Sequence, residues 1–292
     1  YIRNAGGAPA NVAISAARNG LKAGMYCKVG NDDFGKFLLK TLRENNVEPL
    51  APEMTDEATT TMAFVSLNEH NDRSFTFARK PGADMLLTKS EIRDEDLKDC
   101  RIVQAGSCSL SAGPAVEATE YAMARAKELG KQVGFDINYR NLMWKDDKRA
   151  CTEKVLSILK YVDFLKLSDE EIDMVGGHDN LLNVMKEYDI AAAVLTLGGD
   201  GAEVFYDGKS YVVPGFKVSH VADTTGAGDA FWGGFLSCVL NHGVASVDQL
   251  NAELLQEAVK YGNVSGSLSV QEKGAISSLP TREKVEKFLA EN

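Results

Sequence analysis

The stretch DTTGAGDAF, residues 223–231, lies where the pattern of this 292-residue chain changes. Ahead of it, short apolar runs alternate with amphipathic helical patterns, and from Gly226 onward the pattern is helical. Alternation of strand and helix predicts an α/β fold: a doubly wound, mostly parallel central sheet flanked by helices on both faces. Because ligands of such folds bind at the carboxyl ends of the strands, polar side chains at those ends are the candidates for a functional site.

The other expected elements follow from hydrophobic periodicity. Short apolar runs predict buried strands at residues 22–30, 100–106, 131–138, 162–168 and 191–198. A period of three to four residues predicts helices at 9–20, 33–45, 112–130, 180–189, 228–240, 252–270 and 281–292. Since no repeat or long linker interrupts the chain, we expect a single domain over residues 1–292.

Two segments are expected to form hairpins. Residues 59–80 alternate like two strands joined by a polar turn near 69–73. This hairpin is either a small β-sheet lid beside the binding crevice or an antiparallel extension of the sheet edge, and the pattern does not separate the two. A second hairpin is predicted at 203–213, where Asp207-Gly208 is a strong two-residue turn signal.

Composition excludes several classes of function. Lys and Arg number 32 against 42 Asp and Glu, a net charge of −10 with no basic block, so we expect no nucleic-acid partner. No apolar stretch approaches the roughly 18–20 residues of a membrane span, and we expect no membrane partner. Five scattered cysteines fit reduced thiols in a cytoplasmic protein, and the four histidines lie too far apart for a metal site.

The stretch 223–231 itself carries the strongest chemical signal. An acidic residue such as Asp229 in the first turn of a helix is often only a cap, stabilising the helix by about 0.3–1 kcal/mol. Here, however, Gly226 and Gly228 flank Ala227 and leave backbone amides open at the positive end of the helix dipole. The stretch therefore predicts an anion site with a carboxylate beside it.

Weaker signals occur at other turns and strand ends. NAGGAPANVA (4–13) runs through paired glycines into a helix start, and FDINYRNLMW (135–144) puts Asp136, Asn138 and Arg140 on one side of a strand end if alternation continues.

LSDEE (167–171) is either a helix cap at Ser168 or a carboxylate cluster that holds Mg²⁺ through water. GNDDFGKF (30–37) nearly matches a phosphate-binding loop but has Phe37 where a hydroxyl is required, so it is better interpreted as a helix cap. Glycine turns, an anion site and a water-held metal together suit phosphoryl transfer.

These residues also carry a family likeness. The chain resembles the ribokinase-like carbohydrate kinases, and most closely their fructokinase branch. One spaced pattern runs from Gly6-Gly7 through Pro9 and Asn11 to Gly20 and Gly30, and the second is DTTGAGDAFWGG. The resemblance covers essentially the whole chain and implies an ATP-dependent kinase that phosphorylates a primary hydroxyl, converting fructose to fructose 6-phosphate.

The resemblance implies a role for each matching residue. Asp229 would be the base that takes the proton of the acceptor hydroxyl, and the amides of Gly226, Ala227 and Gly228 would form the anion hole. The implied substrate contacts are Gly6, Gly7, Asn11, Arg79, Asn138 and Arg140. The implied ATP side comprises Ser168, Thr196, Gly198, Gly201 and Asn263. Mg²⁺, held through water, is implied near Glu171, and a K⁺ site near Asp223, Thr225, Ser269, Gly274 and Ser278.

Two departures from the family pattern stand out. Ser168 replaces the Asn of the N-x-x-E motif, so a hydroxyl has to substitute at the nucleotide. Family members also begin with a strand ending in a sugar-binding aspartate, and Tyr1 follows that point, so one strand and part of the sugar pocket are expected to be missing.

Rival interpretations remain open. A 2-keto-3-deoxygluconate kinase shares the two arginines but tends to carry an aromatic hydroxyl where this chain has Phe77, which mildly favours fructose. A sugar-binding sensor without catalysis would have no need of the base Asp229. The expected partners are a sugar and ATP, with a possible homodimer formed through the lid.

Overall fold

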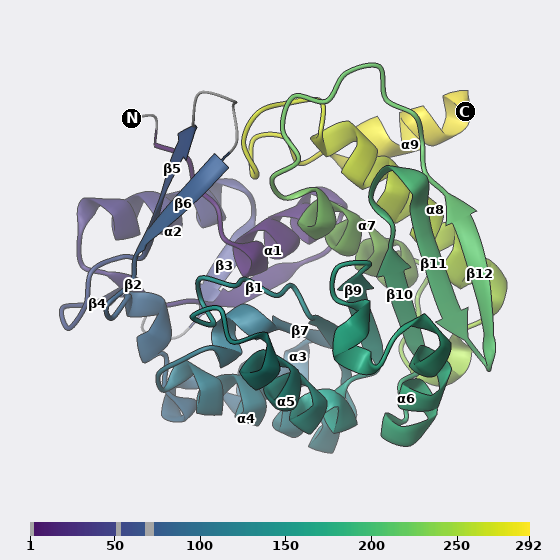
Figure 1. Ribbon diagram of the computed structural model, residues 1–292. Helices are drawn as coiled ribbons and strands as arrows, with labels where there is room; N and C mark the ends of the chain where they lie inside the picture. The colour runs from purple at the N-terminus through teal and green to yellow at the C-terminus, as the bar shows by residue number, and fades with distance from the viewer. Residues whose placement is uncertain (1–2, 51–53, 68–72) are drawn as a thin grey trace.

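The central feature of the computed structural model is a six-stranded sheet, with residues 3–50, 54–67 and 73–292 of the chain described (Figure 1). Its strand order is β12-β11-β10-β9-β8-β7. The parallel part consists of β7 (Ile102–Gly106), β8 (Gln132–Asp136), β9 (Phe164–Ser168) and β10 (Ala192–Thr196), and the antiparallel edge of β11 (Gly201–Tyr206) and β12 (Lys209–Pro214). The expected mostly parallel sheet is confirmed, and so is the second hairpin, because Asp207 (φ 48°) and Gly208 (φ 71°) form its turn.

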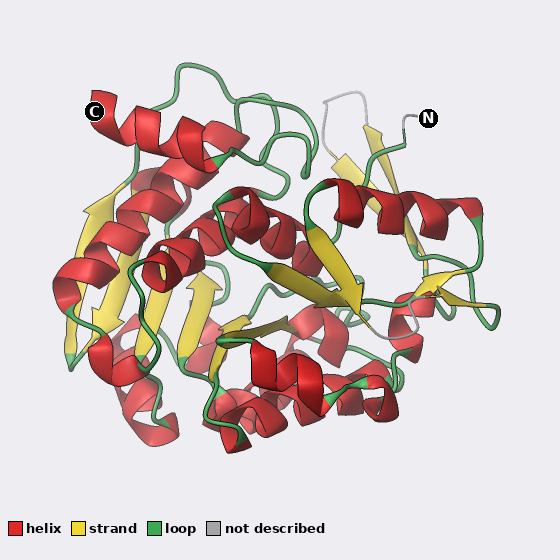
Figure 2. Ribbon diagram, turned by 180° about the vertical axis from the view of Figure 1, so that it is seen from behind, coloured by secondary structure: helices red, strands yellow, loops and turns green. Residues whose placement is uncertain are grey.

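Helices cover both faces of this sheet. One face carries α4 (Ala115–Glu128), α5 (Lys148–Ile158) and α6 (Leu181–Tyr188), with α3 (Asp94–Asp99) beside α4 (Figure 1). The opposite face carries α7 (Ala227–Asn241) and α8 (Ala252–Ser269), as the view from behind shows (Figure 2). Next to them are α1 (Ala8–Arg18), which packs on α7, α9 (Arg282–Glu291), which packs on α8, and α2 (Asp33–Glu44). Every helix predicted from periodicity is present.

Strand alternation divides the apolar core between these two helical layers. Along β10, Ala193 and Leu195 belong to the cluster under α4, α5 and α6, whereas Ala192 and Val194 belong to the cluster under α7 and α8. Successive side chains of a strand point to opposite faces, so a strand buried on both faces reads as a continuous apolar run. The prediction of helices on both faces of the sheet was based on continuous apolar runs of this kind.

Smaller sheets accompany the central one. The segment expected as one strand at 22–30 is divided into β1 (Ala23–Tyr26), which pairs in parallel with β3 (Val47–Leu50), and β2 (Val29–Gly30), which pairs in parallel with β4 (Met54–Thr55). Neither pair is joined to the six-stranded sheet within the described residues.

The first hairpin forms from β5 (Met62–Leu67) and β6 (Arg73–Ala78). Among the residues that the structure describes, it is a separate two-stranded sheet, so the interpretation as an extension of the main sheet edge is wrong. The hairpin stands away from the body of the molecule in Figure 1. Most of its predicted turn, near 69–73, lies outside the described residues, as does Tyr1.

The near match to a phosphate-binding loop is a helix cap. Asp32 accepts a hydrogen bond from the backbone N–H of Gly35 (2.8 Å) at the start of α2, and from the N–H and hydroxyl of Thr60 (2.8 Å each). Within the described part of the chain, no helix has the length and the apolar run that crossing a membrane requires.

Candidate active site

The carboxyl ends of β8, β9 and β10 lie in register, and the residues there face the start of α7. Gly106 of β7 pairs with Asp136, and Ser168 pairs with Thr196. Asp136, Ser168 and Thr196 therefore lie along one edge of the sheet, as the sequence predicts. This edge is where ligands of doubly wound sheets bind.

The first turn of α7 is formed by the Gly-Ala-Gly sequence. Gly226 adopts a left-handed conformation (φ 82°), and a Cβ there would lie 3.1 Å from the Cβ of Ala275, so glycine is required. The amide of Ala227 donates to the carbonyl of Thr224 at 3.2 Å. The following amides belong to the first helical turn, where N–H groups have no partner within the helix. The turn therefore presents amides to an anion, although that of Ala227 is already engaged.

Asp229 lies in this turn and is 4% exposed. Its carboxylate accepts one hydrogen bond from the side-chain amide of Asn11 at 2.7 Å and another from that of Asn138 at 3.2 Å. Asn11 comes from the start of α1 and Asn138 from the segment after β8, so the fold joins three distant parts of the chain here. Asn138 has a positive φ of 42°, a conformation that is uncommon for a residue with a side chain and that asparagine adopts more readily than most.

The environment of Asp229 suits a base. Burial raises the pKa of its carboxyl, against the opposing effect of the Asn11 amide, the Lys166 and Arg140 charges and the Asn138 amide. A carboxylate with a raised pKa is a stronger proton acceptor than an exposed one. The two asparagines hold it in one orientation, which is what a general base needs.

A buried ion pair next to Asp229 was missed by sequence reasoning. Lys166 of β9 donates to Asp136 at 2.9 Å, and both side chains are buried. The Lys166 ammonium lies beside the Gly-Ala-Gly turn, 3.6 Å from the place where a Cβ of Gly228 would be. The available signal was a lysine inside the apolar run FLKL of the strand.

The charges of this pair follow from its surroundings. Burial raises the pKa of Asp136 to about 6, although Lys166 opposes the shift. Burial lowers the pKa of Lys166, but the carboxylates of Asp136 and Glu171 outweigh it, so its pKa lies above the usual value. Lys166 is therefore a buried cation at neutral pH. The second carboxylate oxygen of Asp136 is buried without a hydrogen-bond partner and is thus available to a ligand or water.

Glu171 links the ends of β8 and β9. Its two carboxylate oxygens accept from the backbone N–H of Tyr139 (2.6 Å) and of Ser168 (2.9 Å), and the residue is 7% exposed. The prediction of a helix cap at Ser168 is wrong, because the Glu171 carboxylate caps the turn instead and only the 3₁₀ turn Ile172–Val175 follows.

The two predicted arginines and the carboxylates of the site lie within electrostatic range of Cys108. Arg140, Asp229, Asp136 and Arg79 all act electrostatically on this thiol, whose pKa burial raises to about 12. Arg140 is exposed, because β8 ends at Asp136 and the simple alternation through 140 does not continue.

Arg79 is held by neighbouring side chains. It forms an ion pair with Asp84 (2.7 Å) and donates to the hydroxyl of Ser111 (3.0 Å). Only 8% of the Arg79 side chain is exposed. Its charge is thus already compensated within the protein.

The residues expected to bind ATP lie at the end of β10, in the turn between β10 and β11, and on α8 next to the end of β12. Thr196 donates to the carbonyl of Leu167 (3.3 Å), and Gly198 and Gly201 take positive φ values (57° and 108°) in the turn between β10 and β11. Asn263 of α8 donates to the carbonyls of Val213 (3.1 Å) and Pro214 (3.2 Å). Its side-chain amide thus anchors β12 to α8.

The loop residues expected at a K⁺ site come together. The Asp223 carboxylate accepts from the N–H of Thr225 (2.8 Å) and of Gly274 (3.1 Å), which joins the start of the stretch 223–231 to the segment after α8. Ser269 ends α8, and the N–H of Ser278 donates to the carbonyl of Gly274 (3.3 Å).

Gly6 and Gly7 precede α1, a few residues before Asn11, and form an exposed segment. A Cβ at either position would meet no atom within 4 Å, so a ligand can approach this backbone.

Comparison with known proteins agrees with this geometry. The sequence pattern of the pfkB family carbohydrate kinases matches residues 2–282, nearly the whole chain. The chain belongs to the pfkB family of carbohydrate kinases. The expected family and enzyme class are thereby confirmed.

Individual pfkB family relatives are similar over almost their full length. Fructokinase-1 from Oryza sativa subsp. japonica is 39% identical, with 99% of this chain and 89% of the relative covered. The crystal structure of fructokinase from Vibrio cholerae O395 in its fructose-, ADP- and calcium-bound form superposes with a TM-score of 0.85 at 34% identity, covering 99% and 92% of the two chains. Fructokinase from Xylella fastidiosa with bound ATP gives a TM-score of 0.89 at 28% identity, covering 99% and 92%. The ribokinase-like fold class is confirmed by these structures.

Proposed function

We propose that this pfkB family enzyme transfers the γ-phosphoryl group of ATP to the primary hydroxyl of fructose, forming fructose 6-phosphate. The observation that carries the proposal is Asp229, a buried carboxylate held by Asn11 and Asn138 beside an anion-binding helix start. The relatives from Oryza sativa, Vibrio cholerae and Xylella fastidiosa are named fructokinases, which supports the choice of sugar.

The chemistry of each step follows from these residues. Asp229 accepts the proton of the sugar hydroxyl as that oxygen forms a bond to the γ-phosphorus. The bond from the γ-phosphorus to the bridging oxygen breaks, and ADP leaves with the electron pair. The amides of Gly226 and Gly228 and the helix dipole stabilise the negative charge on the transferred group. Lys166, buried beside the same turn, adds a positive charge.

The residues around Asp136 and Glu171 fit a Mg²⁺ ion held through water. The buried, unpartnered oxygen of Asp136 can accept from a water ligand, and both oxygens of Glu171 are already engaged by backbone amides, which favours indirect contact. Bound Mg²⁺ neutralises charge on the phosphates of ATP.

A K⁺ ion is proposed at the Asp223 loop. Asp223 and Gly274 join the two loops there. Thr225, Ser269 and Ser278 carry hydroxyl oxygens, the ligand type that hard cations prefer, and the hydroxyls of Ser269 and Ser278 keep their acceptor lone pairs while they donate to the carbonyls of Gly266 and Ala275. This loop leads directly into the turn at 226–228, so an ion there would hold the anion site in place.

The state of Arg79 supports a neutral sugar over a keto acid. An arginine that binds a substrate carboxylate needs a positive charge that the protein has not already compensated. Arg79 instead forms an ion pair with Asp84 and donates a hydrogen bond to Ser111. The 2-keto-3-deoxygluconate kinase alternative is therefore disfavoured.

We also propose that the β5–β6 hairpin is a lid that pairs with the lid of a second copy. Phe64 and Val65 are neighbours on β5 and expose 42% and 47% of their surfaces. Because neighbours on a strand face opposite sides, apolar surface lies on both faces of the hairpin, as at a protein interface.

A sugar panel tests the proposed substrate. Initial rates with ATP and fructose, glucose, ribose or 2-keto-3-deoxygluconate are followed by coupled release of ADP. Fructose should give the highest kcat/KM by at least tenfold. A keto acid phosphorylated ten times better than fructose would replace fructose as the substrate, and no turnover with any sugar would favour the sensor interpretation.

A further inference from the structure

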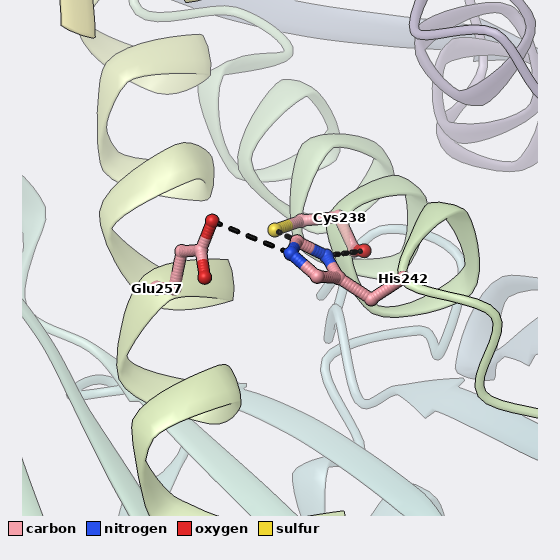
Figure 3. Close-up of side chains that lie close together, drawn as sticks. All are labelled: Cys238, His242 and Glu257. Carbon is pink, nitrogen blue, oxygen red and sulfur yellow. Dashed lines mark hydrogen bonds and ion pairs between the residues drawn. The ribbon is translucent and has the colours of Figure 1, made fainter.

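Three potential metal ligands meet at the far end of α7 from Asp229. Cys238 and His242 lie four residues apart on α7 and its C-cap, and Glu257 faces them from α8 (Figure 3). One ligand atom from each residue lies within 4.8 Å of the other two. Two residues four apart share a helix face, which explains why Cys238 and His242 point the same way.

The hydrogen bonds of His242 select the nitrogen that is free to bind a metal. Nδ1 lies 2.9 Å from the backbone carbonyl of Cys238, and a carbonyl can only accept, so Nδ1 carries a proton. Nε2 is thereby left pointing toward Glu257, at 3.5 Å from a carboxylate oxygen. Metal-binding histidines are typically oriented in this way, with the second ring nitrogen bonded to a carbonyl or carboxylate.

The distance between Nε2 and the Glu257 oxygen fits a tetrahedral ion, and the sulfur of Cys238 completes a set of three ligand atoms within 4.8 Å of one another. Ligands about 2.0–2.1 Å from a tetrahedral metal lie about 3.3 Å apart, close to the 3.5 Å between Nε2 and the Glu257 oxygen. An unprotonated Nε2 facing a carboxylate is unfavourable unless a positive charge lies between them. Either a second ring proton or a metal ion supplies that charge.

Solvent can reach the site. The side chains of His242 and Glu257 are 46% and 61% exposed, and both line a surface hollow of about 320 Å³ together with Glu253 and Gln249. Cys238 lies beneath, 5% exposed, where burial raises its thiol pKa to about 12. A metal ion therefore has to displace the thiol proton before sulfur can coordinate.

We propose that Cys238, His242 and Glu257 form a binding site for Zn²⁺ or a similar transition-metal ion, with water completing the coordination. Thiolate, imidazole and carboxylate together favour Zn²⁺ over Mg²⁺ or Ca²⁺, which take oxygen ligands. The ion links the C-terminal end of α7 to α8, at the opposite end of α7 from the phosphoryl-transfer residues and about 13 Å along the helix from Asp229. The site was missed from the sequence because its third ligand comes from a different helix.

A second histidine–carboxylate pair is a matched control. Nε2 of His178 lies 2.7 Å from Glu203, too close to admit an ion between them, and the His178 side chain is 50% exposed. A metal ion should therefore bind at His242 and not at His178, although both are half-exposed histidines beside a glutamate.

The experiment is titration of the purified, chelator-treated protein with Co²⁺ and Zn²⁺, without nucleotide. We expect one Co²⁺ per chain with a sulfur-to-cobalt charge-transfer absorption band, and competition by Zn²⁺. H242Q and E257Q should weaken Co²⁺ binding at least tenfold, and C238S should abolish the sulfur band. H178Q and C100S, which removes a cysteine elsewhere, should behave like the parent protein.

Thermal melting gives a second readout that is independent of catalysis. Zn²⁺ should raise the melting temperature of the parent protein and of H178Q, but not of H242Q or E257Q. H242Q and E257Q change exposed side chains, so they keep the test decisive even if C238S folds poorly. Equal Co²⁺ binding by the parent protein and H242Q would overturn the proposal and leave a protonated His242–Glu257 ion pair.

Discussion

At the residue scale, the position of Asp229 suits a helix cap, whereas its surroundings suit a catalytic base. Its position in the first turn of α7 would suit a helix cap, but its carboxylate accepts from the side chains of Asn11 and Asn138 and is almost fully buried. Burying a carboxylate is unfavourable without compensation, and the positive charges of Lys166 and Arg140 supply part of it. The two asparagines thus hold a carboxylate with a raised pKa in a single position.

Asp229→Asn tests the base directly. Asparagine keeps the size of the side chain, so the fold should survive, but it cannot take a proton from the sugar hydroxyl. We expect kcat to fall by about 10²–10⁴-fold, equivalent to about 3–5.5 kcal/mol of barrier, with ATP affinity little changed. Steady-state rates and thermal melting of the same preparation check this. A variant that retains more than about a tenth of the normal kcat would mean that the base lies elsewhere.

The pH dependence of kcat should report the ionisation of Asp229. Activity requires the ionised form, and burial raises the carboxyl pKa, so kcat should fall with decreasing pH at a point above the ordinary carboxylate range of about 4. The positive charge of Lys166 lowers the pKa of Asp229. Lys166→Met should therefore raise that pKa and move the acidic limb of the kcat–pH profile to higher pH. Lys40→Met, at a lysine whose side chain is 72% exposed, should not move it. An unshifted limb in Lys166→Met would contradict the assignment of the limb to Asp229.

At the element scale, α7 is the helix on which the site depends. Its start carries the anion-binding turn and Asp229, its length packs between α1 and α8, and its far end carries Cys238. Glycines permit this packing. A Cβ on Gly233 would lie 2.4 Å from the Cβ of Ser15, and one on Gly262 would lie 2.9 Å from the ring of Phe231. The close approach of α1 to α7 brings Asn11 within reach of Asp229.

Gly233→Ala should therefore disturb both stability and catalysis. The added methyl group would also lie 3.0 Å from the backbone oxygen of Val12, which cannot rotate away. Overpacking of this kind costs about 1–3 kcal/mol, so the melting temperature should fall by about 2 °C or more. Gly266→Ala is the control, since its methyl group would meet only ordinary contacts at 3.4 Å and alanine favours the helix. Equal melting temperatures for the two variants would contradict the packing argument.

The loop at Asp223 should respond to the monovalent cation. If K⁺ orders the residues that lead into the turn at 226–228, kcat should rise several-fold when K⁺ replaces tetramethylammonium at constant ionic strength. Asp223→Asn should reduce this activation, because it removes a negative charge from the loop. Rates that do not differ between the two cations would show that the loop needs no ion.

At the scale of the whole molecule, one sheet brings the site together and the hairpin stands apart from it. The strand ends of β8, β9 and β10 and the start of α7 meet at one edge, whereas the β5–β6 hairpin shares no strand pairing with that sheet among the described residues. A two-stranded hairpin has little stability alone, so contact with another surface would favour its ordered form.

Sedimentation should reveal whether a second copy supplies that contact. We expect a dimer at micromolar concentration, and Val65→Lys, which places a charge on the exposed hairpin, should shift it toward monomer. Val212→Lys is the control because Val212 is 65% exposed on the outer strand β12, away from the hairpin. A parent protein that sediments as a monomer would exclude pairing through the hairpin.

The sequence by itself determined the elements and the chemistry that lies within one continuous stretch. Apolar runs and helical periodicity predicted the strands and helices of the central sheet because burial on two faces leaves a local pattern. Asp207-Gly208 predicted the second hairpin, and the glycines at 226 and 228 predicted the turn that begins α7, because positive φ angles favour few residue types. These features depend on neighbours along the chain.

Only the tertiary structure decided what depends on distant residues. The contacts of Asp229 with Asn11 and Asn138 span 218 and 91 positions, and the ion pair of Lys166 with Asp136 joins two strands. The same holds for the compensation of Arg79 by Asp84 and Ser111, and for the meeting of His242 with Glu257. Burial and the distances between charges set pKa values and metal-ligand geometry, and neither is defined until the chain has folded.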